Sequence, residues 1–258
     1  MIWFNLLALC PVIGAATATN HPPGKRGLAS NDGLDLSGFE NTPHGGQSKV
    51  RWQYNWDSDI GDNKISFAEY VPMLHSLRHG HEIVWNDRVN KWLTQGTAHL
   101  LAFNEPERPL PQAAMTVGEA VDAWWRYMEP YAERARLGAP AVSNDGWDWI
   151  TKFLNECQGC HVDYIPVHWY NPNSLEHDFE NWVNQICTLG RPVWVTEFKG
   201  QEGSSQDEIV FLQKAMAFLE GNPCVERYAY FGTANNDLSL LSNEHSHLSE
   251  LGSHYASD

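Results

Sequence analysis

The sequence predicts an α/β protein and, within that class, a single compact (β/α)8 TIM barrel. Eight short runs rich in apolar or β-branched residues recur along the chain, and polar or amphipathic segments separate them. Strands that alternate with helices form parallel sheets, and eight such units in about 230 residues suit a small closed barrel. The runs are Arg26–Asn31, Val50–Asn55, Tyr70–Leu74, His99–Asn104, Arg136–Ser143, Tyr164–Tyr170, Pro192–Phe198 and Glu226–Gly232.

The clearest helices are predicted between the later runs. In Val117–Ala135, apolar residues recur at three- and four-residue spacing, as on one face of a helix. Further helices are predicted at Trp147–Cys157, Phe179–Leu189, Asp207–Glu220 and His247–Tyr255. The first two connections, Asp32–Lys49 and Trp56–Glu69, lack this periodicity, so we expect loops or short helices there. An open doubly wound sheet is the alternative fold, but no G-x-G-x-x-G follows the first run.

The N-terminal segment is typical of a secretory signal peptide, predicted over residues 1–18. An apolar run from Ile2 to Ile13 leads into Ala16-Thr17-Ala18, which fits a signal-peptidase site, although no positive charge precedes the run. A buried N-terminal helix is the alternative. Residues 19–25 are polar and rich in Pro and Gly, which predicts a short linker, and residues 26–258 are expected to form one domain. We therefore expect a secreted protein, extracellular or in the cell wall.

Charge and composition exclude several classes of partner. The chain has 32 acidic and 17 basic residues in 258, a net charge of -15. Nucleic-acid binding needs a basic surface, and an anionic membrane is disfavoured for the same reason. No stretch after the signal segment is apolar enough to span a bilayer. A neutral polymer such as carbohydrate is compatible, and the 12 tryptophans offer flat faces that stack on sugar rings or fill a core.

Removal of the signal segment, with Cys10, leaves four cysteines. An even number in an exported chain favours disulfides, and three pairings of Cys157, Cys160, Cys187 and Cys224 are available. Cys157-Gln-Gly-Cys160 has no second CxxC to complete a zinc ribbon, and it follows a helix rather than preceding one as a redox motif does. We favour Cys157–Cys160 with Cys187–Cys224.

Two glutamates follow apolar runs at equivalent places. The fourth run ends in Asn104-Glu105-Pro106, and the seventh ends in Thr196-Glu197-Phe198. In a barrel, reactive side chains lie at the C-terminal ends of the strands, so both carboxylates are predicted at one mouth. Each glutamate is alternatively an ordinary buried ion-pair partner. Together they suit glycoside hydrolysis, which needs one protonated acid and one carboxylate that acts as nucleophile or base.

The ordered set of motifs resembles glycoside hydrolase family 128, fungal β-1,3-glucanases with a "catalytic core" barrel of the clan A type. The resemblance covers the chain from Arg26 onward. It is carried by Arg26-Gly27-Leu28-Ala29, Tyr54-Asn55-Trp56, Asn104-Glu105-Pro106, Cys157-Gln-Gly-Cys160, Asp163, His168-Trp169-Tyr170, Val193-Trp194-Val195-Thr196-Glu197-Phe198 and Val225-Glu226-Arg227-Tyr228-Ala229-Tyr230-Phe231-Gly232. Phe231 departs from the family pattern, in which many members have Trp, and this puts the stacking at that subsite in doubt.

The resemblance implies an activity and the role of each carboxylate. Residues 26–258 would be a catalytic domain that hydrolyses β-1,3-glucan with retention, with Glu105 as acid/base and Glu197 as nucleophile. Their carboxyl groups would then lie about 5–5.5 Å apart. We expect a monomer that acts on polysaccharide or oligosaccharide without a cofactor. The alternatives are a wall-polysaccharide-binding protein with little turnover and a β-1,4-active relative.

Several neighbouring residues are candidates for substrate binding. Asn104 can hydrogen-bond a sugar 2-hydroxyl, and Tyr170 can orient Glu197. Trp56 and Trp169 are the preferred sugar platforms, and Phe231 lies at the end of the eighth run. His168 is a further candidate. Because adjacent residues of a strand point to opposite sides, one of His168 and Trp169 is expected to face the helices instead.

No metal site is predicted. His75, His79 and His81 have a suggestive spacing, but no carboxylate or cysteine completes a set of ligands around them. Asp57, Asp59, Asp62 and Glu69 resemble part of a calcium loop, with Gly61 one residue out of register for an EF-hand.

Overall fold

The computed structural model describes residues 23–258, apart from 44, 235–237 and 243–246. The predicted signal peptide (1–18) and most of the predicted linker (19–25) therefore lie outside the described residues. In the part that the structure describes, no helix is both long and apolar enough to cross a membrane.

The strands follow the predicted runs closely. They are β1 (Arg26–Ala29), β2 (Trp52–Tyr54), β3 (Glu69–Tyr70), β4 (His99–Leu100), β5 (Arg136–Leu137), β6 (Ile165–Pro172), β7 (Val193–Gln201) and β8 (Val225–Tyr230). Six of them form one parallel sheet in the order β3-β2-β1-β8-β7-β6, and β4 and β5 form a second parallel pair. Single parallel bridges, Met73–Leu101 and Gly138–Tyr164, lie between the two sheets. The chain thus forms one mixed α/β domain.

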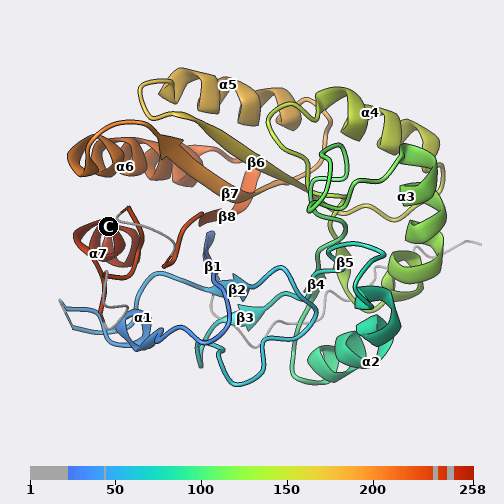
Figure 1. The fold of residues 1–258 in the computed structure, drawn as a ribbon, viewed down its shortest axis with the longest axis horizontal. Coiled ribbons are helices and arrows are strands. Elements are labelled where there is room, and N and C mark those ends of the chain that lie inside the picture. Colours follow the sequence, from blue (N-terminus) through green and yellow to red (C-terminus); the bar gives the residue numbers. More distant parts are fainter. Residues whose placement is uncertain (1–22, 44, 235–237, 243–246) are drawn as a thin grey trace, which may run out of the picture.

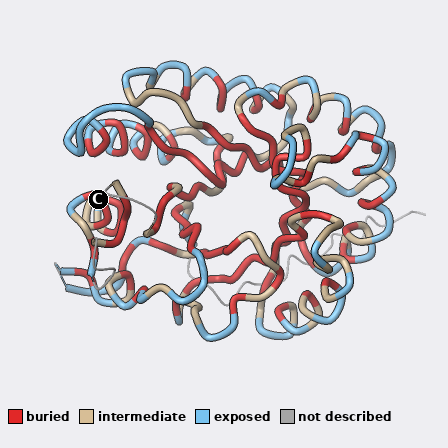
Figure 2. The backbone as a smooth tube through the Cα atoms, viewed as in Figure 1, coloured by how far each residue is buried: buried red, intermediate tan, exposed pale blue. Residues whose placement is uncertain are grey.

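Helices surround the strands on the outside of the molecule (Figure 1). They are α1 (Ser37–Glu40), α2 (His81–Thr94), α3 (Val117–Ala123), η1 (Trp124–Met128), η2 (Glu129–Tyr131), α4 (Trp147–Glu156), α5 (Glu176–Cys187), α6 (Ser205–Gly221) and α7 (Glu250–Ser257). Buried residues follow the central strands and the inward sides of the helices, whereas the outer turns are exposed (Figure 2). Both α3 and α6 begin with a capping box, Thr116 with Glu119 and Ser204 with Asp207.

Two helical segments differ from the prediction. The expected single helix over Val117–Ala135 divides into α3, the π-turn η1 and the 3-10 turn η2. Pro130 lies in η2, and a proline there removes a backbone N–H and crowds the preceding turn, so a regular helix ends. Helix α2 was not among the predicted helices, because its apolar residues Trp85, Val89 and Trp92 form only a narrow buried stripe.

The interior has two apolar regions. One lies between strands and helices, where Trp169 packs on Phe179 and Phe211. The other lies among the strands, where Trp194 contacts Trp52 and Tyr164. Trp124 and Trp194 are fully buried. Trp125, the neighbour of Trp124 in η1, is 46% exposed, because η1 carries it to the outer side.

Both predicted disulfides are present. Cys157–Cys160 closes the turn that follows α4, with Cα atoms 5.5 Å apart. Cys187–Cys224 joins the end of α5 to the segment before β8, with Cα atoms 6.0 Å apart. Each bridge therefore fixes a connection that leads into a strand, β6 or β8.

Candidate active site

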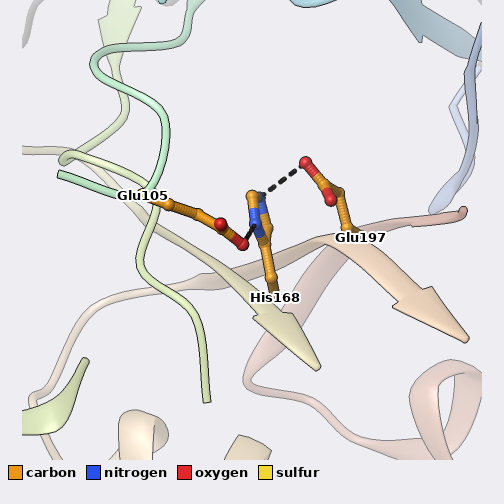
Figure 3. A group of neighbouring side chains, drawn as sticks. All are labelled: Glu105, His168 and Glu197. Carbon is orange, nitrogen blue, oxygen red and sulfur yellow. Dashed lines mark hydrogen bonds and ion pairs between the residues drawn. The ribbon is translucent and has the colours of Figure 1, made fainter. Parts of the chain in front are cut away.

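Glu105 lies just beyond β4, on a segment that still contacts its neighbour. Its N–H donates to Ala141 O at 2.7 Å, and Asn104 bridges to the same residue. The backbone φ of Glu105 is +42°, a left-handed conformation that non-glycine residues rarely adopt. Such strain is typical of functional residues that the surrounding structure holds in place. The side chain points toward Glu197 across the strand ends (Figure 3).

Glu197 lies within β7, directly opposite His168 of β6. The register pairs these two residues, with an irregularity between Val167 and His168. Trp169 is paired in turn with Phe198, which lies on the opposite face. The side chains of Glu197 and His168 consequently lie on the face of the strands that points away from the helices, and both are buried.

His168 joins the two carboxylates (Figure 3). Its Nδ1 is 2.8 Å from Glu105 Oε1, and its Nε2 is 3.3 Å from Glu197 Oε1. Burial would lower the pKa of His168, but the charges of Glu197 and Glu105 raise it above its ordinary value. Burial likewise favours a neutral Glu105, yet its hydrogen bond to His168 lowers the pKa of that carboxyl. The two carboxylates therefore favour the charged form of the imidazole that lies between them.

Three further donors surround Glu197. Trp56 Nε1 donates to Oε1 at 2.7 Å, and the Tyr170 hydroxyl donates to Oε2. The Tyr54 hydroxyl donates to Thr196 O at 3.0 Å and lies 3.5 Å from Glu197 Oε1. Burial and the Glu197 charge raise the pKa of Tyr170 well above its usual range, so it remains a donor. These contacts fix the orientation of the Glu197 carboxylate.

A pocket of about 690 Å³ opens above the carboxylates. Trp56, Asn104, Tyr170 and Phe231 all line it, as the sequence predicted, together with both glutamates. The residues that sequence reasoning missed are Asn31, His75, Arg108, Gln112, Ser143, Asn144, Asp145, Asn171 and Gln201. Five of them end or directly follow a predicted strand run, namely Asn31, His75, Ser143, Asn144 and Asn171, and this position was the signal available to find them.

The structure contradicts the prediction that Trp169 is a sugar platform. It is fully buried among Phe179 and Phe211, and its Nε1 donates to Asp178 Oδ2 at 2.9 Å. Side chains of adjacent strand residues point to opposite faces. Because His168 lies beneath the pocket, the Trp169 side chain points toward the helices. A side chain with no exposed surface offers no platform for a sugar.

Asn104 is held by a residue from the following loop. Its Nδ2 donates to Gln112 Oε1 at 2.8 Å, whereas its Oδ1 is buried with no hydrogen-bond partner among the described residues. The backbone carbonyl of Gln112 accepts from the Arg78 guanidinium. Gln112 thus fixes the amide plane of Asn104 at the edge of the pocket.

The described residues contain one group with metal-like spacing. Ligand atoms of Glu105, His168 and Glu197 lie within 4.8 Å of one another, but His168 Nδ1 and Glu105 Oε1 are already hydrogen-bonded to each other. The three histidines whose spacing was noted in the sequence do lie together: the His81 ring lies 5.5 Å from that of His75 and 6.1 Å from that of His79. Burial and the neighbouring His81 lower the pKa of His75 to about 4, so it faces the pocket as a neutral imidazole.

Two buried carboxylates close together at one end of parallel strands are the arrangement that glycoside hydrolysis requires. Residues 27–255 match the sequence profile of the glycosyl hydrolase catalytic core. The chain therefore belongs to the glycosyl hydrolase catalytic core family, within glycoside hydrolase family GH128. This confirms the family that its motifs indicated.

Solved structures of this family superimpose on almost the whole chain. A GH128 subgroup III curdlan-specific exo-β-1,3-glucanase from Blastomyces gilchristii, in complex with glucose, is 37% identical, with a TM-score of 0.79 over 92% of this chain and 100% of that chain. A subgroup I endo-β-1,3-glucanase from Amycolatopsis mediterranei, in complex with laminaritriose, is 26% identical, with a TM-score of 0.75 over 90% of this chain and 98% of that chain.

One curated relative is longer. Alkali-sensitive linkage protein 1 of Schizosaccharomyces pombe is 32% identical over 253 residues. The match covers 91% of this chain and 44% of that protein, so the chain spans less than half of its length.

Proposed function

We propose that this chain is a retaining glycoside hydrolase that cleaves β-1,3-glucan, with Glu105 as acid/base and Glu197 as nucleophile. The observation that carries the proposal is that an oxygen of each carboxylate lies within 4.8 Å of the other. Retaining enzymes hold their carboxyl groups about 5–5.5 Å apart, whereas inverting enzymes leave about 6.5–9.5 Å for a water molecule. The short separation favours retention.

The contacts of Glu197 suit a nucleophile. Hydrogen bonds from Trp56 and Tyr170 hold the carboxylate in place at the pocket. Glu197 attacks the anomeric carbon and forms a glycosyl ester, while Glu105 gives its proton to the departing glycosidic oxygen. A water molecule then attacks the same carbon, Glu105 removes its proton, and the ester bond breaks with release of Glu197.

The proton that Glu105 delivers is stored on His168. In the resting site, the neighbouring carboxylates raise the pKa of His168, His168 lowers the pKa of Glu105, and the two share a hydrogen bond of 2.8 Å. Movement of one proton along that bond leaves neutral His168 and protonated Glu105, which is the form required for general acid catalysis. Loss of the Glu197 charge in the ester intermediate removes one of the two anions that hold the proton on His168.

The choice of β-1,3-glucan is supported by the relatives and by the pocket. The Blastomyces and Amycolatopsis enzymes were solved with glucose and with laminaritriose. The pocket here combines apolar rings, Trp56 and Phe231, with the amide of Asn104 at the acid/base side. Rings stack on sugar faces and the amide binds a hydroxyl, so the lining suits a neutral glucan.

A closed eight-stranded barrel is part of the same proposal. The first strand pairs with the last, β1 with β8, as closure requires. The bridges Met73–Leu101 and Gly138–Tyr164 lie where β3 would meet β4 and where β5 would meet β6. Closure would gather the strand ends that carry Glu105 and Glu197 at one mouth.

We further propose that the protein acts outside the cell as a monomer, as residues 26–258 in a single catalytic domain. Two disulfides suit an oxidising compartment, and the apolar segment at residues 1–18 suits export. The net charge of -15 disfavours binding to anionic polymers but not to a neutral one such as extracellular glucan.

The test is hydrolysis of laminarin by the wild type and by Glu105→Gln and Glu197→Gln. Both variants should lose release of reducing sugar while keeping the fold, and Glu180→Gln on α5, an exposed ion-pair residue, is the matched control. Azide should restore turnover of a substrate with a good leaving group in Glu105→Gln, with a retained product. Azide with Glu197→Ala should give an inverted product. Equal stereochemistry from both would show that the roles are misassigned.

Two alternatives have distinct signatures. Laminarin binding without sugar release by the wild type would indicate the wall-polysaccharide-binding protein. Release from a β-1,4-glucan in preference to laminarin would indicate the β-1,4-active relative.

A further inference from the structure

A second hollow adjoins the catalytic pocket on the side of Glu105. It has a volume of about 800 Å³ and lies between the β4–α3 connection and the first turns of α4. Arg108 and Asp145 line both this hollow and the catalytic pocket. The two hollows are therefore neighbours that this pair of residues separates, and we call the second one the outer groove.

The junction between the hollows is an exposed ion pair. Arg108 pairs with Asp145 at 2.7 Å, and its Nε donates to Ser143 Oγ at 3.0 Å. Both partners are substantially exposed, with side-chain exposures of 41% and 68%. Exposed ion pairs contribute about 0–1 kcal/mol, so a ligand that crosses the junction displaces this one at little cost.

The lining of the outer groove combines an aromatic ring with a mixed polar rim. Trp149 is half-buried: Phe153 stacks on it at 5.6 Å, and its Nε1 donates to Met115 O at 3.1 Å. Along the rim, Lys152 is basic, whereas Asp148 and Glu119 are acidic. Because residues of both charges line the groove, it favours neither an anion nor a cation. The fixed aromatic ring can stack on a sugar, so the lining suits a neutral polyhydroxyl ligand.

We propose that the outer groove binds additional glucosyl units of the same glucan chain, on the leaving-group side of the cleaved bond. This inference rests on the proposed function. Glu105 protonates the leaving oxygen, and the residues that directly follow it, Pro106 and Glu107, form the wall of the groove. Long chains would therefore contact Trp149, whereas di- and trisaccharides that fill the catalytic pocket would not reach it.

The first experiment measures ligand protection of lysines in the Glu197→Gln background, which prevents turnover. Lys152 borders the groove, is 65% exposed and pairs with Glu156. Lys214 on α6 is its matched control, because it is 56% exposed and pairs with Glu176. Laminarihexaose should slow acetylation of Lys152 several-fold and leave Lys214 unchanged, and laminaribiose should protect neither. Equal acetylation of Lys152 with and without laminarihexaose would overturn the proposal, whether or not the wild type hydrolyses glucan.

The second experiment compares Trp149→Ala with Trp125→Ala, a matched control at an exposed tryptophan away from both hollows. In the Glu197→Gln background, Trp149→Ala should weaken laminarihexaose binding by roughly five- to tenfold. With Glu197 intact, it should leave kcat/KM for an aryl laminaribioside unchanged, which also shows that the variant folds. Trp125→Ala should change neither. Equal loss on the short and long substrates would contradict the proposal, and absence of hydrolysis in the wild type would instead contradict the proposed function.

Discussion

His168 has no solvent-exposed surface, yet it lies at the centre of the candidate chemistry. Its two ring nitrogens contact the two carboxylates, at 2.8 Å to Glu105 and 3.3 Å to Glu197. Two anions close to one imidazole favour the imidazolium, which outweighs the cost of burial. A single side chain thus couples the charge of the proposed nucleophile, Glu197, to the proton of the proposed acid, Glu105.

Replacement of His168 tests this coupling. In His168→Gln the stored proton is lost, so Glu105 must take its proton from water. We expect kcat on laminarin, a substrate with a poor leaving group, to fall by about 10²–10³. On a dinitrophenyl glucoside, which needs no acid, the loss should be less than about tenfold. Measurement of kcat on both substrates tests whether His168 supplies the proton. Equal losses of kcat on the two substrates would indicate that His168 has only a structural role.

Gln112 is a positioning residue for Asn104, through the hydrogen bond of 2.8 Å. Gln112→Leu should lower kcat/KM on a glucoside by about tenfold, because the amide that binds the 2-hydroxyl loses its orientation. On the corresponding 2-deoxyglucoside the same substitution should have little effect, since no 2-hydroxyl is present. An equal loss on both substrates would assign the effect to a distorted loop instead.

At the scale of secondary structure elements, the two disulfides fix different lengths of chain. Cys157–Cys160 spans three residues of sequence, whereas Cys187–Cys224 spans 37 and ties α5 to the segment before β8. Chain entropy assigns more stabilisation to the longer loop, above the roughly 3 kcal/mol of a 15-residue loop.

The corresponding prediction compares two single substitutions. Cys187→Ser should lower the melting temperature more than Cys160→Ser does. Calorimetry of both variants measures this, with the unpaired partner blocked by alkylation. Titration of the unfolded, unreduced wild type should find no reactive thiol among the four cysteines of the described chain. A larger loss in Cys160→Ser would mean that the turn before β6 outweighs chain entropy.

Across the whole molecule, buried carboxyl groups give opposite pH dependences of stability. Burial would raise the pKa of Glu69, but Arg227 at 2.7 Å and His99 at 2.9 Å lower it to about 2. Burial raises the pKa of Glu208 to about 7, despite donors from Tyr230 at 2.7 Å and Gly200 at 3.0 Å. Glu69 therefore stabilises the fold above its ordinary pKa, and this contribution is lost as pH falls toward 2.

Glu208 gives a prediction for the neutral range. Its native pKa lies above that of the unfolded chain, so its contribution is complete below about 4.5 and is lost as pH rises to about 7. Glu208→Gln should remove this slope, worth about 3 kcal/mol, and be the more stable protein at pH 8. Urea denaturation from pH 4.5 to 8 measures the difference. Parallel pH profiles of wild type and variant would show that Glu208 is ionised at little cost.

Local patterns were sufficient to predict the strands and to single out the two glutamates. Apolar runs that alternate with polar segments predict where strands lie. A carboxylate directly after such a run can be identified without any knowledge of contacts. Glu105 and Glu197 could therefore be singled out from the sequence, and so could Asn104 and Tyr170 beside them. The motif order similarly indicated the family to which the chain belongs.

Only the tertiary structure decided which side each residue faces and which distant residues meet. The strand register placed His168 between the carboxylates and turned Trp169 into the core, a choice that alternation alone leaves open. His75, Gln112 and Arg108 reach the pocket from loops, whose path depends on packing rather than on local periodicity. The raised pKa of His168 likewise exists only because residues 105 and 197, far apart in sequence, lie on either side of one ring.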